Sequence, residues 1–273
     1  MQSLALALVV VCLSAQIGSS FRNRIPVPGI QKSAWSRCAS VELGGGFQST
    51  ATATAVKTWT LRTCLRDHRT ILSKLPQILG AYVGPNSIEP KTNEAVMLAV
   101  NALNDCPYCT GLHGELARMA ANPLGQSSST EGEAILKFAK TFSKNDGRGA
   151  SVEAGLSTLK EAAGGRATSV AALCWFLHWG SFGGNTINAI RGKLMGLLSQ
   201  SRTPGTGTLS LFDIPFFLYY GPLFLIIGLL NKALTVMPEV PPVVSSSIGV
   251  ALALVGGAWM VLPAALGCLF YRD

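Results

Sequence analysis

The chain has 273 residues, of which 48% are hydrophobic and 13% are charged. Soluble domains carry about 25% charged residues, so the low charge and the mean hydropathy of +0.36 exclude a disordered or fibrous protein and favour membrane segments. Half of the net charge of +8 lies in residues 1–57, and the rest of the chain has no long Lys/Arg run, so we expect no nucleic-acid partner.

The N-terminal residues have the composition of a targeting sequence. Residues 4–15 are apolar except for Ser14, too few to span a bilayer, and small residues follow them. This pattern predicts a signal peptide over residues 1–20, although its usual basic start is missing. Residues 21–57 are rich in Ser, Thr, Ala and Gly and contain one acid, which is typical of a transit peptide.

The order of these two segments suggests a cellular location. A signal followed by a transit-like segment that starts at Phe21 resembles the bipartite presequence of algae with complex plastids. The resemblance implies a plastid protein, in the thylakoid or envelope membrane, with its helical domain facing the stroma. The alternative that the residues leave open is a protein of the secretory pathway, secreted or in its membranes.

An all-α domain is predicted over residues 58–203. Apolar residues recur there at helical spacing, and no alternating run or hairpin signal predicts a strand. Pro76 should kink or split the first helix, and the glycines at 180–184 should break the last. The predicted helices cover residues 68–83, 87–103, 106–121, 131–142, 151–163 and 168–198.

Two long apolar segments follow a linker at 201–208. Residues 248–270 are twenty-three uncharged residues, and a membrane-spanning helix needs about 20. Residues 214–230 are seventeen and contain two prolines, so a buried soluble helix is the alternative there. Basic residues lie beside the domain and at the C-terminus, which predicts a membrane hairpin over residues 204–273 with both ends on one side.

The seven cysteines do not form a disulfide framework. Cys12 and Cys38 lie in the predicted presequence, and the other five are scattered apart from one close pair. We expect Cys64, Cys174 and Cys268 to be buried and to act as small hydrophobic residues. We also expect His68 and His178 to be ordinary core or surface residues, and Trp175, Phe176 and Trp179 to be packing residues.

The close pair, Cys106 and Cys109, has the surroundings of a reactive thiol. Pro107 suits the first position of a helix, so Cys106 falls at the N-cap and Cys109 in the first turn. Free N–H groups and the helix dipole stabilise a thiolate there. His113 lies four residues after Cys109 on the same helical face, and Glu94 comes from the preceding helix.

By themselves these four residues leave a redox site, a zinc site and inert core cysteines open. Structural zinc more often pairs two C-x-x-C units or adds a distant pair of histidines. The chain has no P-loop, dinucleotide-binding glycine motif or haem attachment motif. We therefore expect neither a metal nor a cofactor.

The arrangement E-x(11)-C-x-x-C-x-x-x-H resembles the signature of the AhpD-like alkylhydroperoxidases, in the carboxymuconolactone decarboxylase superfamily. The resemblance covers residues 65–200, and the region of His178, Asn185 and Asn188 is similar to the helix that packs against the motif in that family. It does not cover the presequence or the hydrophobic tail. The decarboxylase branch of the superfamily lacks the cysteine pair, which argues against lactone decarboxylation.

The resemblance implies a thiol peroxidase. Cys109 would attack the hydroperoxide, Cys106 would supply the proton and then form the disulfide, and Glu94 and His113 would act as the proton relay. An external dithiol would reduce the disulfide, and the helical unit would form trimers or hexamers. Alternatives are a catalytically silent subunit or a redox adaptor, docked to a plastid membrane complex.

Overall fold

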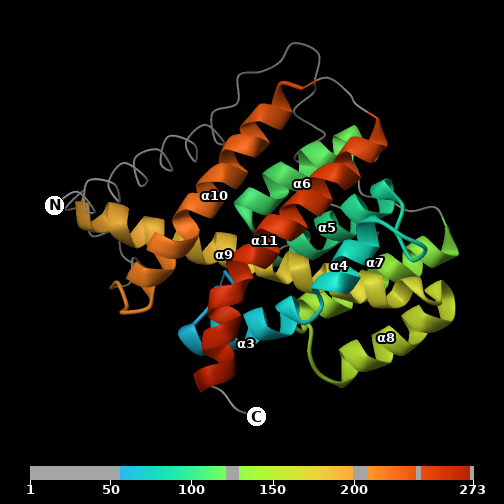
Figure 1. Ribbon diagram of the computed structural model, residues 1–273, viewed down its shortest axis with the longest axis horizontal. Helices are drawn as coiled ribbons and strands as arrows, with labels where there is room; N and C mark the ends of the chain where they lie inside the picture. The colour runs from blue at the N-terminus through green and yellow to red at the C-terminus, as the bar shows by residue number, and fades with distance from the viewer. Residues whose placement is uncertain (1–55, 121–128, 199–207, 238–240, 271–273) are drawn as a thin grey trace, which may run out of the picture. The chain divides into compact units, whose positions relative to one another are not determined.

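The computed structural model describes residues 56–120, 129–198, 208–237 and 241–270. The predicted signal peptide, nearly all of the predicted transit segment, Cys12 and Cys38 lie outside the described residues. Residues 57–273 form one compact unit, in which the described part is all-α (Figure 1). Its helices are α3 (Leu61–Leu72), α4 (Leu75–Tyr82), α5 (Pro90–Asn104), α6 (Pro107–Met119), α7 (Thr130–Lys144), α8 (Ala150–Ala163), α9 (Arg166–Leu198), α10 (Asp213–Thr235) and α11 (Pro242–Phe270).

The first predicted helix is two helices, as Pro76 indicated. Residues 73–74 separate α3 from α4, and Pro76 lies in the first turn of α4, where its missing N–H has no partner to lose. The first helix also starts earlier than predicted. Thr60 forms a capping box with Thr63, which satisfies free N–H groups and begins α3 at Leu61.

Helix α9 runs through the centre of the bundle and is not broken at 180–184, so that prediction was wrong. It packs against α3, α4, α5, α6, α7, α8 and α10. The glycines allow close contact instead of breaking the helix. A Cβ atom on Gly183 would lie 2.8 Å from the ring of Phe224, and one on Gly184 would lie 2.6 Å from the sulfur of Cys106.

The two apolar tail segments form helices α10 and α11, which cross in front of the core helices in the view of Figure 1. Helix α10 packs on α6 and α9, and α11 packs mainly on α3 and α4. Both helices are long and apolar enough to cross a membrane, but both are partly buried in the protein, and core helices of soluble proteins can have the same properties. The tail thus belongs to the same compact unit as the core helices.

The inner face of α11 carries small residues that allow a close approach. Gly257, Ala264 and Gly267 are seven and three residues apart, which places them on one side of the helix. A Cβ atom on Gly267 would lie 2.6 Å from the carbonyl oxygen of Leu65, and one on Gly257 would lie 2.8 Å from Leu75. Helix α11 is therefore fitted closely to α3 and α4.

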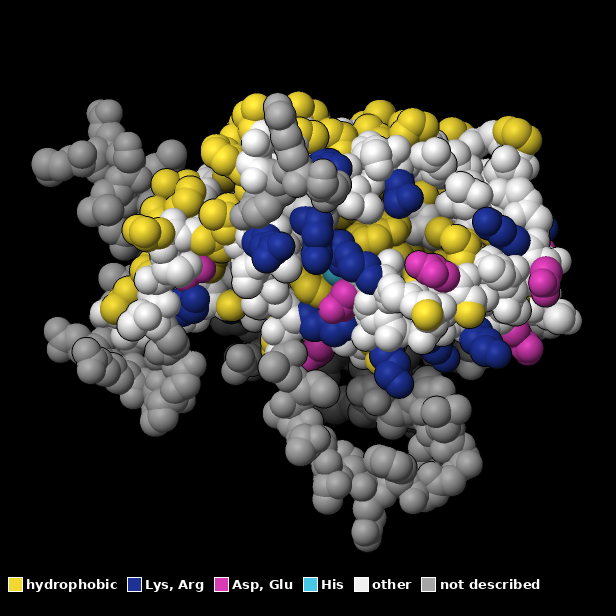
Figure 2. All heavy atoms as spheres, turned by 90° about the horizontal axis from the view of Figure 1, so that it is seen from below, with side chains coloured by type: hydrophobic (Ala, Val, Ile, Leu, Met, Phe, Trp, Pro, Cys, Tyr) yellow, Lys and Arg dark blue, Asp and Glu magenta, His cyan; other side chains and the backbone are white. Residues whose placement is uncertain are grey.

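The outer faces of α10 and α11 remain apolar. Figure 2 shows hydrophobic side chains along the upper edge of the molecule, with charged side chains below them. The exposed cysteine Cys268 is on this part of α11, so the prediction that it is buried was wrong, whereas Cys64 and Cys174 are buried. The exposed large hydrophobic residues of the two helices include Ile214, Leu218, Ile226, Leu229, Val243, Leu254, Val255, Val261, Leu262, Leu269 and Phe270.

A buried histidine joins α10 to the core. His68 donates from Nδ1 to the carbonyl oxygen of Cys64 over 2.6 Å, and its Nε2 accepts hydrogen bonds from Tyr220 of α10 and from Trp179, the latter over 3.2 Å. Burial lowers the pKa of His68 to about 4, so the ring is neutral at physiological pH. His178 is also in the core, where it bonds Asp67 over 3.0 Å. Both are core histidines, as expected.

Candidate active site

The turn between α5 and α6 places the two cysteines. Asp105 adopts a left-handed conformation, with φ of 51°, and ends α5. Cys106 is the N-cap of α6, as the sequence predicts, and its sulfur accepts the backbone N–H of Cys109 over 3.4 Å. Pro107 is the first residue of the helix. Cys109 therefore lies in the first turn, beside the positive end of the helix dipole.

Asparagine side chains hold this turn in place. Asn101 accepts the N–H of Cys106 over 3.1 Å through Oδ1 and donates to the hydroxyl of Thr110. From α9, Asn185 donates to the carbonyl oxygen of Asn104 over 2.7 Å. The family resemblance pointed to Asn185, but nothing in the sequence singled out Asn101. Its signal is only its position, five residues before the first cysteine.

Glu94 and His113 form a buried acid–base pair. Glu94 is 2% exposed, and its Oε2 lies 2.9 Å from Nδ1 of His113. Burial by itself would lower the pKa of His113, but the hydrogen bond and charge of Glu94 outweigh it and raise that pKa. The pair thus favours an imidazolium one helical turn after Cys109.

The two thiols are both buried and differ in acidity. Cys106 is 0% and Cys109 is 6% exposed, and neither is in a disulfide. Burial, with the hydrogen bond and charge of Cys109, raises the pKa of Cys106. The hydrogen bond from Cys106 lowers the pKa of Cys109 against the opposing effect of burial, and the charge of His113 and the hydroxyl of Ser181 lower it further. Cys109 is therefore the better nucleophile.

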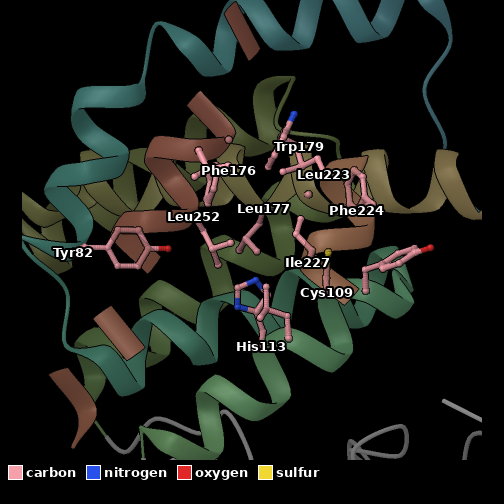
Figure 3. A pocket seen from close by; sticks show the side chains of 15 residues that line it. Tyr82, Cys109, His113, Phe176, Leu177, Trp179, Leu223, Phe224, Ile227 and Leu252 are labelled. Carbon is pink, nitrogen blue, oxygen red and sulfur yellow. The ribbon is translucent and has the colours of Figure 1, made fainter. Parts of the chain in front are cut away.

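A narrow apolar cavity of about 50 Å³ opens on Cys109 and His113. Figure 3 shows both side chains at its edge, facing aromatic and aliphatic groups. This wall could not be predicted from the sequence, because its residues come from helices far apart in the chain. They were expected to be packing residues or part of the membrane hairpin. The wall includes Phe176, Leu177 and Trp179 of α9, Leu223, Phe224 and Ile227 of α10, and Leu252 and Val255 of α11.

The structure brings all four predicted site residues to one place. Glu94 is hydrogen-bonded to His113, which follows Cys109 by one turn of α6. Cys106 is hydrogen-bonded to Cys109. In the part of the chain that the structure describes, no three His, Cys, Asp or Glu side chains are grouped as a metal would require.

Comparison with known proteins agrees with the local geometry. The model of the carboxymuconolactone decarboxylase family matches residues 72–122, which include α4, α5, α6 and all four site residues. None of the curated proteins and none of the solved structures matches the chain. Residues 72–122 are therefore similar to the carboxymuconolactone decarboxylase family, which includes both decarboxylases and AhpD-like peroxidases.

Proposed function

We propose that the protein is a thiol-dependent peroxidase that reduces organic hydroperoxides. The observation that carries this proposal is a pair of adjacent thiols next to the buried Glu94–His113 pair, in which the pKa of Cys109 is lowered and that of Cys106 is raised. A lactone decarboxylase has no evident need for two adjacent thiols. A peroxidase needs one thiolate to attack the peroxide and a second thiol to prevent irreversible oxidation.

The reaction follows from the two thiols. The Cys109 thiolate attacks one oxygen of the hydroperoxide, the O–O bond breaks, and Cys109 becomes a sulfenic acid. The departing alkoxide takes the proton of the Cys106 thiol and leaves as the alcohol. The Cys106 thiolate then attacks the Cys109 sulfur and the S–O bond breaks, which forms the disulfide, and the departing hydroxide takes a proton from the His113 imidazolium and leaves as water. An external dithiol returns two electrons by thiol–disulfide exchange.

The cavity favours a substrate with an apolar group. Its wall is aromatic and aliphatic, and the reactive groups at its edge are Cys109 and His113. A hydrocarbon chain gains free energy when it leaves water for such a wall, whereas hydrogen peroxide gains nothing from it. We expect alkyl hydroperoxides to react faster than hydrogen peroxide.

The exposed apolar faces of α10 and α11 support a membrane location for this activity. We propose that the protein acts at a membrane, and the predicted presequence leads us to propose a plastid membrane. Homo-oligomers and a dithiol donor remain part of the proposal on the strength of the family resemblance. A redox adaptor or a silent docked subunit remains the alternative, and it would use the same fold.

The proposal is tested by the response of the full chain to peroxide in detergent. The reduced protein is mixed with one equivalent of cumene hydroperoxide, and its disulfides are mapped by mass spectrometry at short times. We expect a bridge between Cys106 and Cys109 that a dithiol reverses. The full chain is used in this experiment because α10 and α11 form part of the cavity wall.

Two variants make the result specific. Cys109→Ser should abolish the reaction with peroxide, whereas Cys106→Ser should leave a sulfenic acid on Cys109 that a dimedone probe captures. Cys268→Ser is the matched control, because Cys268 is exposed on α11 and should not affect the reaction. If the Cys106 and Cys109 thiols of the wild type stay reduced in peroxide, the peroxidase proposal is wrong and the docked subunit is favoured.

A further inference from the structure

Helix α11 reaches the acid–base pair through one hydroxyl group. The Oγ of Ser245 donates to Oε1 of Glu94 over 3.1 Å, and the other oxygen, Oε2, pairs with His113 over 2.9 Å. Ser245 is 1% exposed and Glu94 is 2% exposed. Both oxygens of this buried carboxylate are thus occupied, one from α6 and one from α11.

The contact joins two distant parts of the chain. Ser245 follows Glu94 by 151 residues and lies in the segment that the sequence assigns to a membrane hairpin. Two residues later, Ser247 is exposed, and its hydroxyl donates to the carbonyl oxygen of Val243 in its own helix. A serine in a helix can satisfy its hydroxyl with this local bond to the carbonyl four residues earlier. Ser245 instead donates across to another helix, which offsets the cost of burying its hydroxyl.

The side chains of His113 and Ser245 donate to the Glu94 carboxylate from α6 and α11. The titratable groups around it are His113 on α6 and Tyr82 on α4, and burial and then the charge of Glu94 raise the pKa of Tyr82. Helix α11 contributes no charged residue between Pro242 and Phe270. The hydroxyl of Ser245 is therefore the group through which α11 contacts the Glu94 carboxylate.

We propose that Ser245 is a positioning residue of the thiol site: its hydroxyl holds one oxygen of Glu94 so that the other stays directed at His113. This inference rests on the proposed function and extends it, because it makes α11 part of the machinery that activates Cys109. The family domain at residues 72–122 supplies the thiols and the acid–base pair, and the C-terminal helix completes their hydrogen bonding.

Removal of the hydroxyl should weaken the activation of Cys109. One buried oxygen of Glu94 would lose its donor, so the other oxygen would be held less firmly toward Nδ1 of His113 and would raise the pKa of His113 less. His113 would then be a cation for less of the time, and the Cys109 thiolate would lose part of its stabilisation. The pH at which half of Cys109 is ionised should rise.

The test measures this midpoint directly. The full chain in detergent micelles is reduced and treated with iodoacetamide across a pH series, and the rate of alkylation at Cys109 is followed by mass spectrometry. We expect Ser245→Ala to raise the midpoint by about 0.5 to 1 pH unit, which is a roughly 3- to 10-fold slower reaction below the midpoint. Ser245→Thr keeps the hydroxyl and should restore most of the wild-type midpoint.

Ser247→Ala is the matched control, because it removes a hydroxyl from an exposed position of the same helix. It should leave the midpoint where it is. A midpoint that is unchanged in Ser245→Ala, or that Ser247→Ala moves equally, would overturn the inference. Alkylation needs no peroxide, so a wild type that forms the disulfide while Ser245→Ala keeps its midpoint refutes only the role of Ser245. A wild type that does not react with peroxide refutes the proposed function.

Discussion

Gly184 lies against the sulfur of Cys106, in the middle of α9. A Cβ atom at this position would be 2.6 Å from that sulfur, closer than real Cβ atoms approach their neighbours. Cys106 is fully buried, so its side chain has little room to move away. The absence of a side chain at Gly184 therefore determines where the Cys106 thiol can lie.

Gly184→Ala should displace Cys106 and slow the formation of its disulfide with Cys109. We expect a loss of about tenfold or more, because a misplacement of ~1 Å can cost up to ~100-fold in rate. The rate is measured by quenching the reaction with peroxide at set times and quantifying the disulfide by mass spectrometry.

Gly192→Ala is the control on the same helix. Gly192 is exposed, and a Cβ atom there would meet no atom within 4 Å beyond the nearby backbone of its own helix. Alanine is the better helix former by about 1 kcal/mol, so this variant should be at least as stable as the wild type and equally fast. Equal rates in the two variants would show that Gly184 does not position Cys106.

At the scale of elements, α11 is attached to the core by close contacts. Gly267 lies so near the backbone of α3 that a Cβ atom would be 2.6 Å from the carbonyl oxygen of Leu65. A backbone atom cannot turn aside as a flexible side chain can. The small residue is therefore a condition for this packing, which in turn holds Ser245 and the cavity wall in place.

Gly267→Ala should separate α11 from α3 and destabilise the protein. Overpacking of this kind costs about 1–3 kcal/mol, which corresponds to a fall in Tm of roughly 2 to 12 °C in a chain of this size. Thermal unfolding in detergent measures the change. Ala265→Leu, at an exposed position two residues away, adds more volume and should leave Tm nearly unchanged. If Tm fell in both variants, the cause would be added volume anywhere on α11 and not the contact of Gly267 with Leu65.

At the scale of the whole molecule, the apolar outer surface of α10 and α11 lies on one side and most of the visible charge lies below it (Figure 2). Such a surface fits the hydrocarbon boundary of a lipid bilayer. Since both helices also form the wall of the cavity, a membrane at this surface would bring lipid-derived hydroperoxides close to Cys109.

Residues 57–273, one compact unit, should therefore float with lipid vesicles in a density gradient. Replacement of the exposed residues Leu254, Val261 and Leu262 by Asn should lower the bound fraction at least tenfold, since burial of each side chain contributes about 1.5–3 kcal/mol.

The control for flotation changes three exposed residues of α8 to Asn, at Ala154, Thr158 and Ala162. These residues are four apart on α8, which packs on α7 and α9, so the bound fraction should not change. A wild-type unit that stays at the bottom of the gradient would show that this surface does not bind lipid.

The features that could be predicted from the sequence are local. The N-cap position of Cys106, the place of Cys109 in the first turn and the same-face position of His113 all follow from spacings within one helix. The division of α3 from α4 near Pro76 has the same origin, because a proline constrains only its own turn. The all-α fold of the described residues follows from apolar periodicity.

The contacts between distant helices could not be predicted in this way. Helices α10 and α11 are apolar on nearly every side, so their composition does not show which face meets the core or that Cys268 faces outward. The bond from Ser245 to Glu94 and the contact of Gly184 with Cys106 depend on how those helices pack. Spacing along the chain thus determined which residues form the candidate site, because it fixes their positions along α5 and α6, whereas the packing of distant helices determined the groups that surround them.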